Sequence, residues 1–197
     1  MRDEFYADGK DVWKWACTLD AAEGKTHILH VAMYRPDKRR SYGKTFCNLE
    51  KNGKRVVSFF DEERQLLRQK DLLRRVERLD SRIEVLSKPY SREVRVRYFE
   101  EVVNKLKRRT AGSYVVLLDP DTGIEPTKSS DNHVCCDDIR SIWRGMNPGD
   151  ILLVVQFCRF EHQAESCQQK LRSVLDGEVR ALLHPATRNV RILRADK

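Results

Sequence analysis

The sequence lacks any apolar run that could cross a membrane, because its longest runs are about six residues and a spanning helix needs roughly 20. Its start, MRDEFYADGK, lacks the apolar core of a signal peptide. None of its six cysteines form a C-x-x-C pair, and Cys135 and Cys136 are adjacent, which suits neither a zinc site nor a disulfide. We therefore expect a cytoplasmic protein with reduced thiols and no membrane partner.

Glycine-rich loops and repeats are missing as well. The nine glycines are scattered, and none of them forms the G-x-G of a dinucleotide-binding loop. No internal repeat, low-complexity stretch or linker divides the chain. A chain of 197 residues is long enough to bury a core without disulfides or metal ions. We expect one α/β domain over 1–197.

The apolar pattern alternates between strands and helices. Strands are expected over 27–34, 55–60, 82–88, 114–118, 151–157, 178–184 and 189–195, and helices over 11–23, 61–81, 91–109, 137–146 and 164–175. This alternation predicts a three-layer, Rossmann-like α/β fold whose mostly parallel central sheet ends in a C-terminal antiparallel hairpin. The runs YVVLL and ILLVVQF are apolar without alternation, so we expect them to be adjacent central strands.

Acidic residues follow the first of these two runs. Asp119 and Asp121 are two residues apart, so their side chains fall on the same side of an extended chain, and Glu125 follows in the same turn. Three carboxylates this close repel one another unless a cation lies among them. Mg²⁺ or Mn²⁺, held by carboxylates and substrate phosphates, is the usual solution. The alternative is a well-formed turn, because Asp-Pro and Asp-Thr-Gly are also common turn sequences.

Other polar residues complete the expected site. Lys128 and Arg159 are candidates for stabilising charge on a reacting phosphate, while Gln156 and His133 are candidates for substrate binding. For Lys128 the alternative is a solvent-facing lysine, and for His133 it is a surface residue that caps the next helix.

Basic residues outnumber acidic ones by 38 to 30, which gives a net charge of +8 at pH 7. On helices, such cations are usually paired on a solvated face. The polar segment after the first expected strand differs, because aromatic residues are interleaved with its cations. It is predicted to contact nucleic acid, with salt-dependent affinity, through Arg35, Lys38, Arg39, Arg40 and Lys44.

Three resemblances bear on these residues. DPDTGIE resembles the D-x-D-x-x-x-E of Toprim domains, which implies Mg²⁺ and an upstream acid after RVVSFF, although the Glu-Gly expected there is missing. DPDT also resembles, by its position after the fourth expected strand, the D-P-P-Y of nucleic-acid methyltransferases. Over most of the chain, DVWKWACTLDAA, ILHVAMYRP, LLDPDTGIEP and DILLVVQFCR resemble a family of bacterial proteins with a DPD-[NT]-G segment. That family resemblance implies that Asp119, Asp121 and Gly123 act together.

These patterns predict a Mg²⁺-dependent phosphoryl-transfer enzyme, most concretely a nuclease or another phosphodiesterase that acts on nucleic acid. Asp119, Asp121 and Glu125 would hold the metal, and Glu125 would also activate water. Two alternatives remain open. One is a methyltransferase-like domain that uses S-adenosylmethionine, and the other is a non-catalytic nucleic-acid- or protein-binding module on the same fold.

Overall fold

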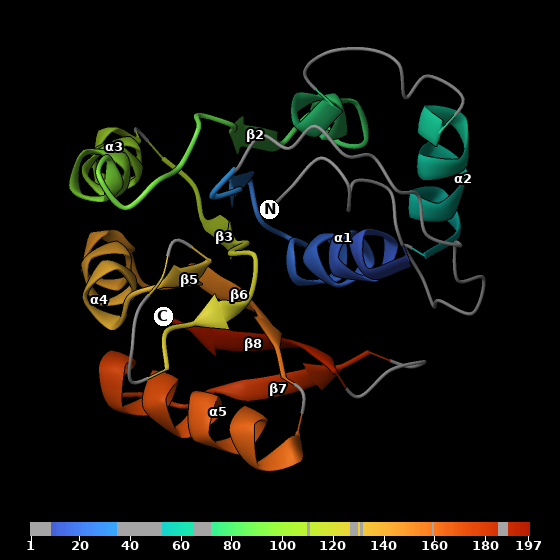
Figure 1. Ribbon diagram of the computed structural model, residues 1–197. Coiled ribbons are helices and arrows are strands. Elements are labelled where there is room, and N and C mark those ends of the chain that lie inside the picture. The colour runs from blue at the N-terminus through green and yellow to red at the C-terminus, as the bar shows by residue number, and fades with distance from the viewer. Residues whose placement is uncertain are drawn as a thin grey trace.

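The computed structural model describes residues 9–34, 53–64, 72–109, 111–126, 130, 132–158, 160–184 and 189–197. Its helices are α1 (Gly9–Ala21), α2 (Gly53–Arg64), the 3₁₀ helix η2 (Leu72–Arg78), α3 (Arg95–Arg108), α4 (Cys136–Gly145) and α5 (Glu161–Leu175) (Figure 1). Its strands are β1 (His27–Val31), β2 (Ile83–Leu86), β3 (Tyr114–Leu118), β4 (Gly123–Ile124), β5 (His133–Val134), β6 (Ile151–Phe157), β7 (Arg180–Leu183) and β8 (Val190–Asp196). Among the helices described here, none is long and apolar enough to span a membrane.

Six of the described strands form one sheet in the order β2-β1-β3-β6-β8-β7. The strands β2, β1, β3 and β6 are parallel, and β8 lies antiparallel between β6 and β7. β3 and β6 are neighbours inside the sheet, with Val115 opposite Ile151 and Leu118 opposite Val154. The prediction of a mostly parallel, Rossmann-like sheet with a C-terminal antiparallel pair is confirmed.

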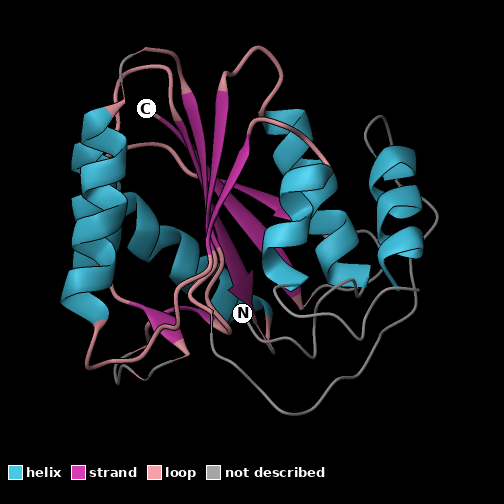
Figure 2. Cartoon of the chain, turned by 90° about the horizontal axis from the view of Figure 1, so that it is seen from above, coloured by secondary structure: helices cyan, strands magenta, loops and turns pink. Residues whose placement is uncertain are grey.

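Helices cover both faces of this sheet (Figure 2). One core lies between the sheet and α1, α2 and η2, and includes Trp15 and Phe60. The other lies between the sheet and α3, α4 and α5, and includes Tyr98 and Ile139. Because side chains alternate along a strand, neighbouring residues of β3 enter different cores. The face toward α1 is called the α1 face below.

The run RVVSFF is helical, so the prediction of a strand over 55–60 is wrong. Val56 and Phe60 are both fully buried and lie four residues apart, which places them on one face of α2. A single α-helix over 61–81 is also wrong, since residues 72–78 form a 3₁₀ helix. The buried residues Leu73, Val76 and Leu79 recur every three positions, which is the period of a 3₁₀ helix.

Candidate functional site

The order of the sheet reverses at β1, because β2 is added on one side of β1 and β3 on the other. In open parallel sheets, ligands bind outside the carboxyl ends of the strands at such a reversal. A hydrogen bond links the carboxyl ends of β1 and β3: the N–H of Asp119, which follows β3, donates to the carbonyl of Val31, the last residue of β1 (3.0 Å). The acidic segment Asp119–Gly123 therefore begins at the place where this architecture positions ligands.

A cavity of about 230 Å³ lies beside this segment on the α1 face. Sites for drug-sized ligands measure ~300–1,000 Å³, so this one admits a single ring system or a phosphate group. One wall is apolar, whereas the other carries charged groups from α1 and from the segment after β3. The cavity is lined by Lys10, Asp11, Lys14, Asp119, Pro120, Asp121, Thr122, Val155, Phe157 and Val190.

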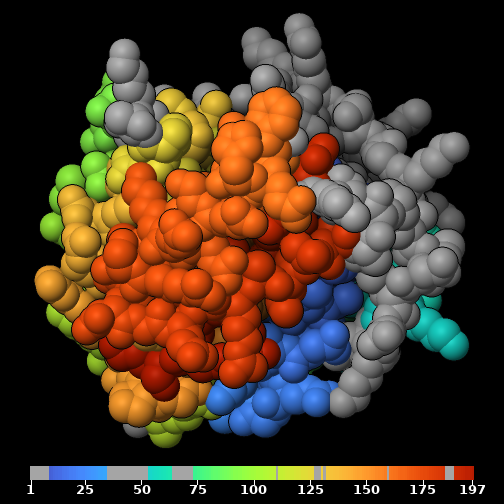
Figure 3. Space-filling model, turned by 90° about the horizontal axis from the view of Figure 1, so that it is seen from below, coloured from blue at the N-terminus to red at the C-terminus, as the bar shows by residue number. Residues whose placement is uncertain are grey.

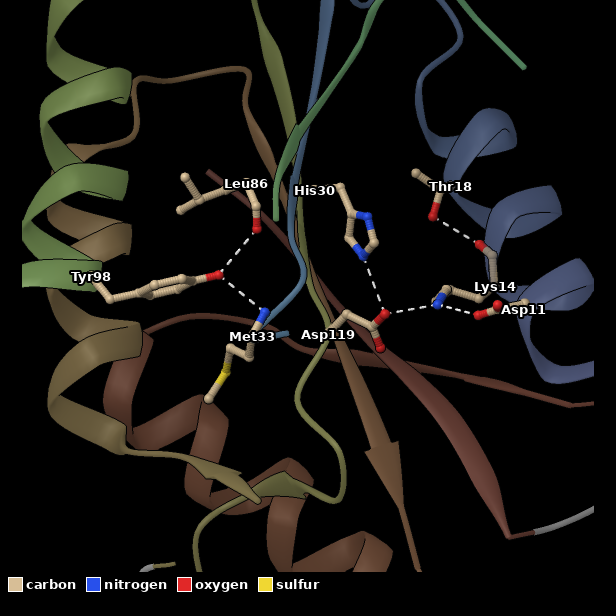
Figure 4. Close-up of polar contacts among 8 residues, drawn as sticks. All are labelled: Asp11, Lys14, Thr18, His30, Met33, Leu86, Tyr98 and Asp119. Atoms are coloured by element: carbon tan, nitrogen blue, oxygen red, sulfur yellow. Dashed lines mark hydrogen bonds and ion pairs between the residues drawn. The ribbon is translucent and has the colours of Figure 1, made fainter. Parts of the chain in front are cut away.

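Asp119 is held by two buried side chains from different elements (Figure 4). Lys14 Nζ donates to Asp119 Oδ2 (2.7 Å) and also to Asp11 Oδ1, and His30 Nε2 lies 3.1 Å from the same Asp119 oxygen. Lys14 and Asp119 are each 4% exposed, and His30 is fully buried. Charges this deeply buried are tolerated only when they are paired and hydrogen-bonded.

The pKa values of the three groups follow from this pairing. Burial opposes ionisation of Asp119, but the Lys14 charge and the His30 hydrogen bond outweigh it and hold the Asp119 pKa far below its usual range. Burial likewise opposes the Lys14 charge, yet Asp11 and Asp119 raise the Lys14 pKa above its usual range. Burial lowers the pKa of His30. At neutral pH, Asp119 is a carboxylate, Lys14 an ammonium and His30 neutral, so Lys14 is not a proton acceptor.

Gln156 fixes the acidic segment against β6. Its Oε1 accepts the Ile124 N–H (2.8 Å), and its Nε2 donates to the carbonyls of Thr122 (3.3 Å) and Phe157 (2.9 Å). Gly123 has a φ of +119°, and a Cβ there would stand 2.4 Å from Gln156 Oε1. The amide that the sequence indicates for substrate binding is thus engaged by the backbone that positions the segment.

The structure places Glu125 and His133 away from the cavity lining. Glu125 Oε1 accepts the N–H of Cys136 (2.9 Å), the first residue of α4, where a carboxylate complements the helix dipole. His133 Nδ1 lies 2.8 Å from Ser130 Oγ, and burial lowers the His133 pKa. The other expected site residues lie outside the described residues: Arg35, Lys38, Arg39, Arg40, Lys44, Lys128 and Arg159.

The three-carboxylate metal site does not assemble. Asp119 and Asp121 both line the cavity, but Glu125 caps α4, and Asp119 Oδ2 already binds Lys14 and His30. Over the part of the chain that the structure describes, no three His, Cys, Asp or Glu side chains are grouped to hold a metal ion. These residues do not fit a metal held by protein ligands alone, whereas Mg²⁺ completed by substrate phosphates needs only one or two carboxylates.

The described residues directly after β1, 32–34, carry no glycine-rich loop of the kind that binds S-adenosylmethionine. No glycine lies between Lys25 and Tyr34. The Met33 N–H donates to Tyr98 Oη (3.0 Å), which in turn donates to the carbonyl of Leu86 (3.3 Å) (Figure 4). Tyr34 pairs with Pro89, and its carbonyl accepts the N–H of Tyr90 (2.7 Å). The residues described directly after β1 are therefore held by Tyr98, Pro89 and Tyr90.

Sequence reasoning missed the partners of Asp119. Lys14 lies between Trp13 and Trp15 in a helix that is buried on most sides, and His30 lies inside the apolar run HILHV. The sequence did contain one indication of this pairing, which is a lysine between two tryptophans. A helix that buries both tryptophans also buries the lysine, and Lys is almost never fully buried unless it is paired. The partner of Lys14 could not be predicted from the sequence, since Asp119 is 105 residues away along the chain.

The upstream acid that the Toprim resemblance implies does not lie at the end of a strand. Three acids follow RVVSFF directly, and all three lie on helix α2 rather than after a strand; two of them, Asp61 and Glu62, are exposed. The third, Glu63, is paired with Arg75 and Arg78. This part of the Toprim arrangement is therefore wrong.

No known protein-family model matches the chain, and no curated protein is detectably similar to it, so the resemblance to the DPD-[NT]-G family stays a prediction.

Proposed function

We propose that the cavity on the α1 face binds an amino-bearing nucleobase of unpaired nucleic acid. The observation that carries this proposal is the pairing of an aromatic wall, Phe157, with an acidic wall, Asp119 and Asp121, in a space of about 230 Å³. Aromatic side chains stack on the face of a base, and carboxylates accept hydrogen bonds from the exocyclic amino groups of adenine and cytosine.

The charge of the lining supports a hydrogen-bond donor rather than a bare phosphate. Three carboxylates and two ammonium groups line the cavity, so these residues together carry one net negative charge. Lys14 is already bonded to two carboxylates, and Lys10 Nζ lies 5.1 Å from the centre of the Phe157 ring. A phosphate would meet like charge here unless a cation accompanied it. The amino group of a base would instead meet carboxylate oxygens, which accept hydrogen bonds.

The architecture supports the same class of ligand. Rossmann-like methyltransferases often end in an antiparallel strand pair, and Asp119-Pro120-Asp121-Thr122 resembles the Asp-Pro-Pro-Tyr of nucleic-acid methyltransferases. The segment follows the third described strand along the chain rather than the fourth, because RVVSFF is helical. The likeness therefore concerns shape and sequence pattern alone. Because the residues described directly after β1 carry no glycine-rich loop, the described groups support base binding, and no methyl-transfer step follows from them.

If the cavity recognises amino-bearing bases, the affinity for single-stranded oligonucleotides should depend on their base. The anisotropy of labelled oligonucleotides measures this affinity. We expect oligo(dA) and oligo(dC) to bind at least fivefold more tightly than oligo(dT), because thymine presents O4 where the other two present an amino group. Phe157→Leu should weaken binding of oligo(dA) about tenfold, since stacking of one base contributes about 1–3 kcal/mol.

The matched control is Phe160→Leu, which removes an exposed phenylalanine three residues away and outside the cavity lining. This variant should bind like the wild type. Equal affinity for all three oligonucleotides, or equal losses in the two variants, would contradict the proposal.

A metal-dependent phosphodiesterase is the second candidate. Two of the three expected carboxylates, Asp119 and Asp121, line one cavity together with Lys10, and this observation favours it. Calorimetry with Mn²⁺ in the presence of an oligonucleotide, on the wild type and on Asp121→Ala, separates the candidates. Binding of Mn²⁺ that Asp121→Ala abolishes would favour the phosphodiesterase over simple base binding.

A further inference from the structure

Arg191 carries a buried guanidinium near the start of helix α5. Val190 and Ile192 contribute to the core on the α1 face, so Arg191 between them lies on the opposite face, which α3, α4 and α5 cover. Arg191 is only 6% exposed. Its Nη2 lies 3.5 Å from Oε1 of Glu161, the first residue of α5, so the guanidinium is directed at the start of that helix.

The pairing of this guanidinium is incomplete. Over the residues that the structure describes, Nε of Arg191 has no hydrogen-bond partner, and the ion pair with Glu161 is long and made with a largely exposed carboxylate. The residues opposite Arg191 on the neighbouring strands are Gln156 and Leu183. Gln156 Oε1 accepts the N–H of Ile124, and leucine has no polar side-chain atom. Because a buried charge is stable only when it is paired and hydrogen-bonded, an anion at the start of α5 would complete the pairing of Arg191.

The first turn of α5 adds hydrogen-bond donors at the same place. The first N–H groups of an α-helix have no acceptor within the helix, and the helix dipole places partial positive charge there. The N-cap residue, Phe160, has an apolar side chain and makes no side-chain hydrogen bond to them. Residues 160–163 are exposed, and α5 forms much of the face seen in Figure 3. A helix N-terminus beside an arginine is an arrangement that binds phosphate groups.

We propose that Arg191 and the first turn of α5 bind a backbone phosphate of the nucleic-acid strand whose base enters the cavity, an assignment that rests on the function proposed above. The two sites lie at the same end of the sheet. Phe157 and Val190 stand opposite each other and line the cavity, while Arg191 follows Val190 and lies on the other face. The strand crosses the carboxyl end of β6, with its base on the α1 face and its phosphate at α5. This placement keeps the phosphate away from the carboxylates of the cavity.

The first test follows thermal unfolding of the intact protein in increasing concentrations of inorganic phosphate, with chloride lowered to keep the ionic strength constant. We expect the Tm to rise by about 3–5 °C when phosphate reaches about ten times its Kd. Arg191→Met preserves the length of the side chain without its charge and should abolish this rise. The variant should fold, because an apolar residue tolerates burial better than an incompletely paired charge. Arg194→Met is the control, since Arg194 of the same strand is paired with Asp196, and its Tm should rise as in the wild type.

Glu161→Gln distinguishes an anion site from a simple ion pair. If Arg191 binds phosphate, removal of the neighbouring carboxylate should tighten phosphate binding about fivefold, because a like charge beside the site is lost. Weaker phosphate binding by this variant would overturn the site. So would a wild-type Tm that does not respond to phosphate, or a rise that persists in Arg191→Met.

The salt dependence of oligo(dA) binding tests whether the phosphate belongs to a nucleic-acid strand or is a free ion. Each phosphate contact with a single strand contributes about −0.7 to the slope of log affinity against log salt concentration. Arg191→Met should therefore flatten the slope by about 0.7, whereas Phe157→Leu should weaken binding without changing the slope. An unchanged slope in Arg191→Met would overturn the assignment to a strand, even if inorganic phosphate binds. Equal affinity for all bases, with the flattened slope retained, would contradict the cavity proposal alone.

Discussion

Replacing Lys14 by methionine is expected to lower the free energy of unfolding by about 3–5 kcal/mol, because the change leaves buried carboxylates without their cation. Lys14 is 4% exposed and is hydrogen-bonded to both Asp11 and Asp119. Methionine preserves the length and packing of the side chain, so the loss reports the charge. Urea denaturation, followed by circular dichroism, measures it.

The matched control is Lys10→Met, one helical turn earlier on α1. Lys10 is exposed, so this change should alter stability by about 0.5 kcal/mol or less. Adding Asp119→Asn to Lys14→Met should recover part of the loss, since it removes one of the two carboxylate charges that Lys14 balances. A Lys14→Met protein as stable as the Lys10→Met protein would contradict the pairing.

The pH dependence of this loss follows from the directions of the pKa shifts. The lowered Asp119 pKa contributes stability that is present above the unfolded value of about 3.9 and is lost as pH falls through the folded pKa. The raised Lys14 pKa contributes stability that is present below about 10.4 and is lost as pH rises through the folded pKa. The difference between wild type and Lys14→Met should therefore be constant from about pH 7 to 9.

The same comparison should change below about pH 6.5, where an unperturbed histidine takes up a proton. Lys14 is one of the groups that lower the His30 pKa, and its removal leaves His30 bonded to Asp119 without the Lys14 charge. Protonation of His30 would then replace part of the missing charge. The stability difference should shrink as the pH is lowered from 7 to 5.

Gly123→Ala is expected to cost about 3 kcal/mol, the second large effect. A φ of +119° is strained for any L-residue with a Cβ, which contributes about 1–2 kcal/mol. The new Cβ would also stand 2.4 Å from Gln156 Oε1 and displace the amide from its bond to the Ile124 N–H, which adds about 1–3 kcal/mol. Chemical denaturation with a two-state fit measures the sum.

Gly149→Ala separates strain from collision, because Gly149 has a φ of +89° but nothing within 4 Å of its missing Cβ. This variant should lose only about 1 kcal/mol. In a Gln156→Ala background, Gly123→Ala should also fall to about that cost, since the side chain that it strikes is gone. Equal costs for Gly123→Ala with and without Gln156 would contradict the close approach.

Much of the fold was readable because its signals are local. The runs YVVLL and ILLVVQF have no polar alternation, which only strands buried on both faces require, and they became the adjacent strands β3 and β6. On α3, Phe99, Val102 and Leu106 recur at helical spacing, and all three are buried. The run RVVSFF was wrongly predicted to be a strand, because a short apolar run of six residues is as compatible with a strand as with one face of a helix.

The site was only partly readable. The position of Asp119 and Asp121 at a strand end followed from the sequence, and both line the cavity. Glu125 is only four residues from Asp121, yet Gly123 and the β4–β5 pairing carry it to the start of α4. Proximity along the chain therefore did not make the three carboxylates one site.

The sequence by itself determined the α/β alternation, the two central strands and the acidic segment that follows one of them, because burial periodicity and turn chemistry act between residues close along the chain. Only the tertiary structure decided what Asp119 binds. Its partners Lys14 and His30 are 105 and 89 residues away, and no local preference encodes such pairs. They are selected when α1 and β1 pack beside β3, because a charge buried there is stable only next to its counter-charge.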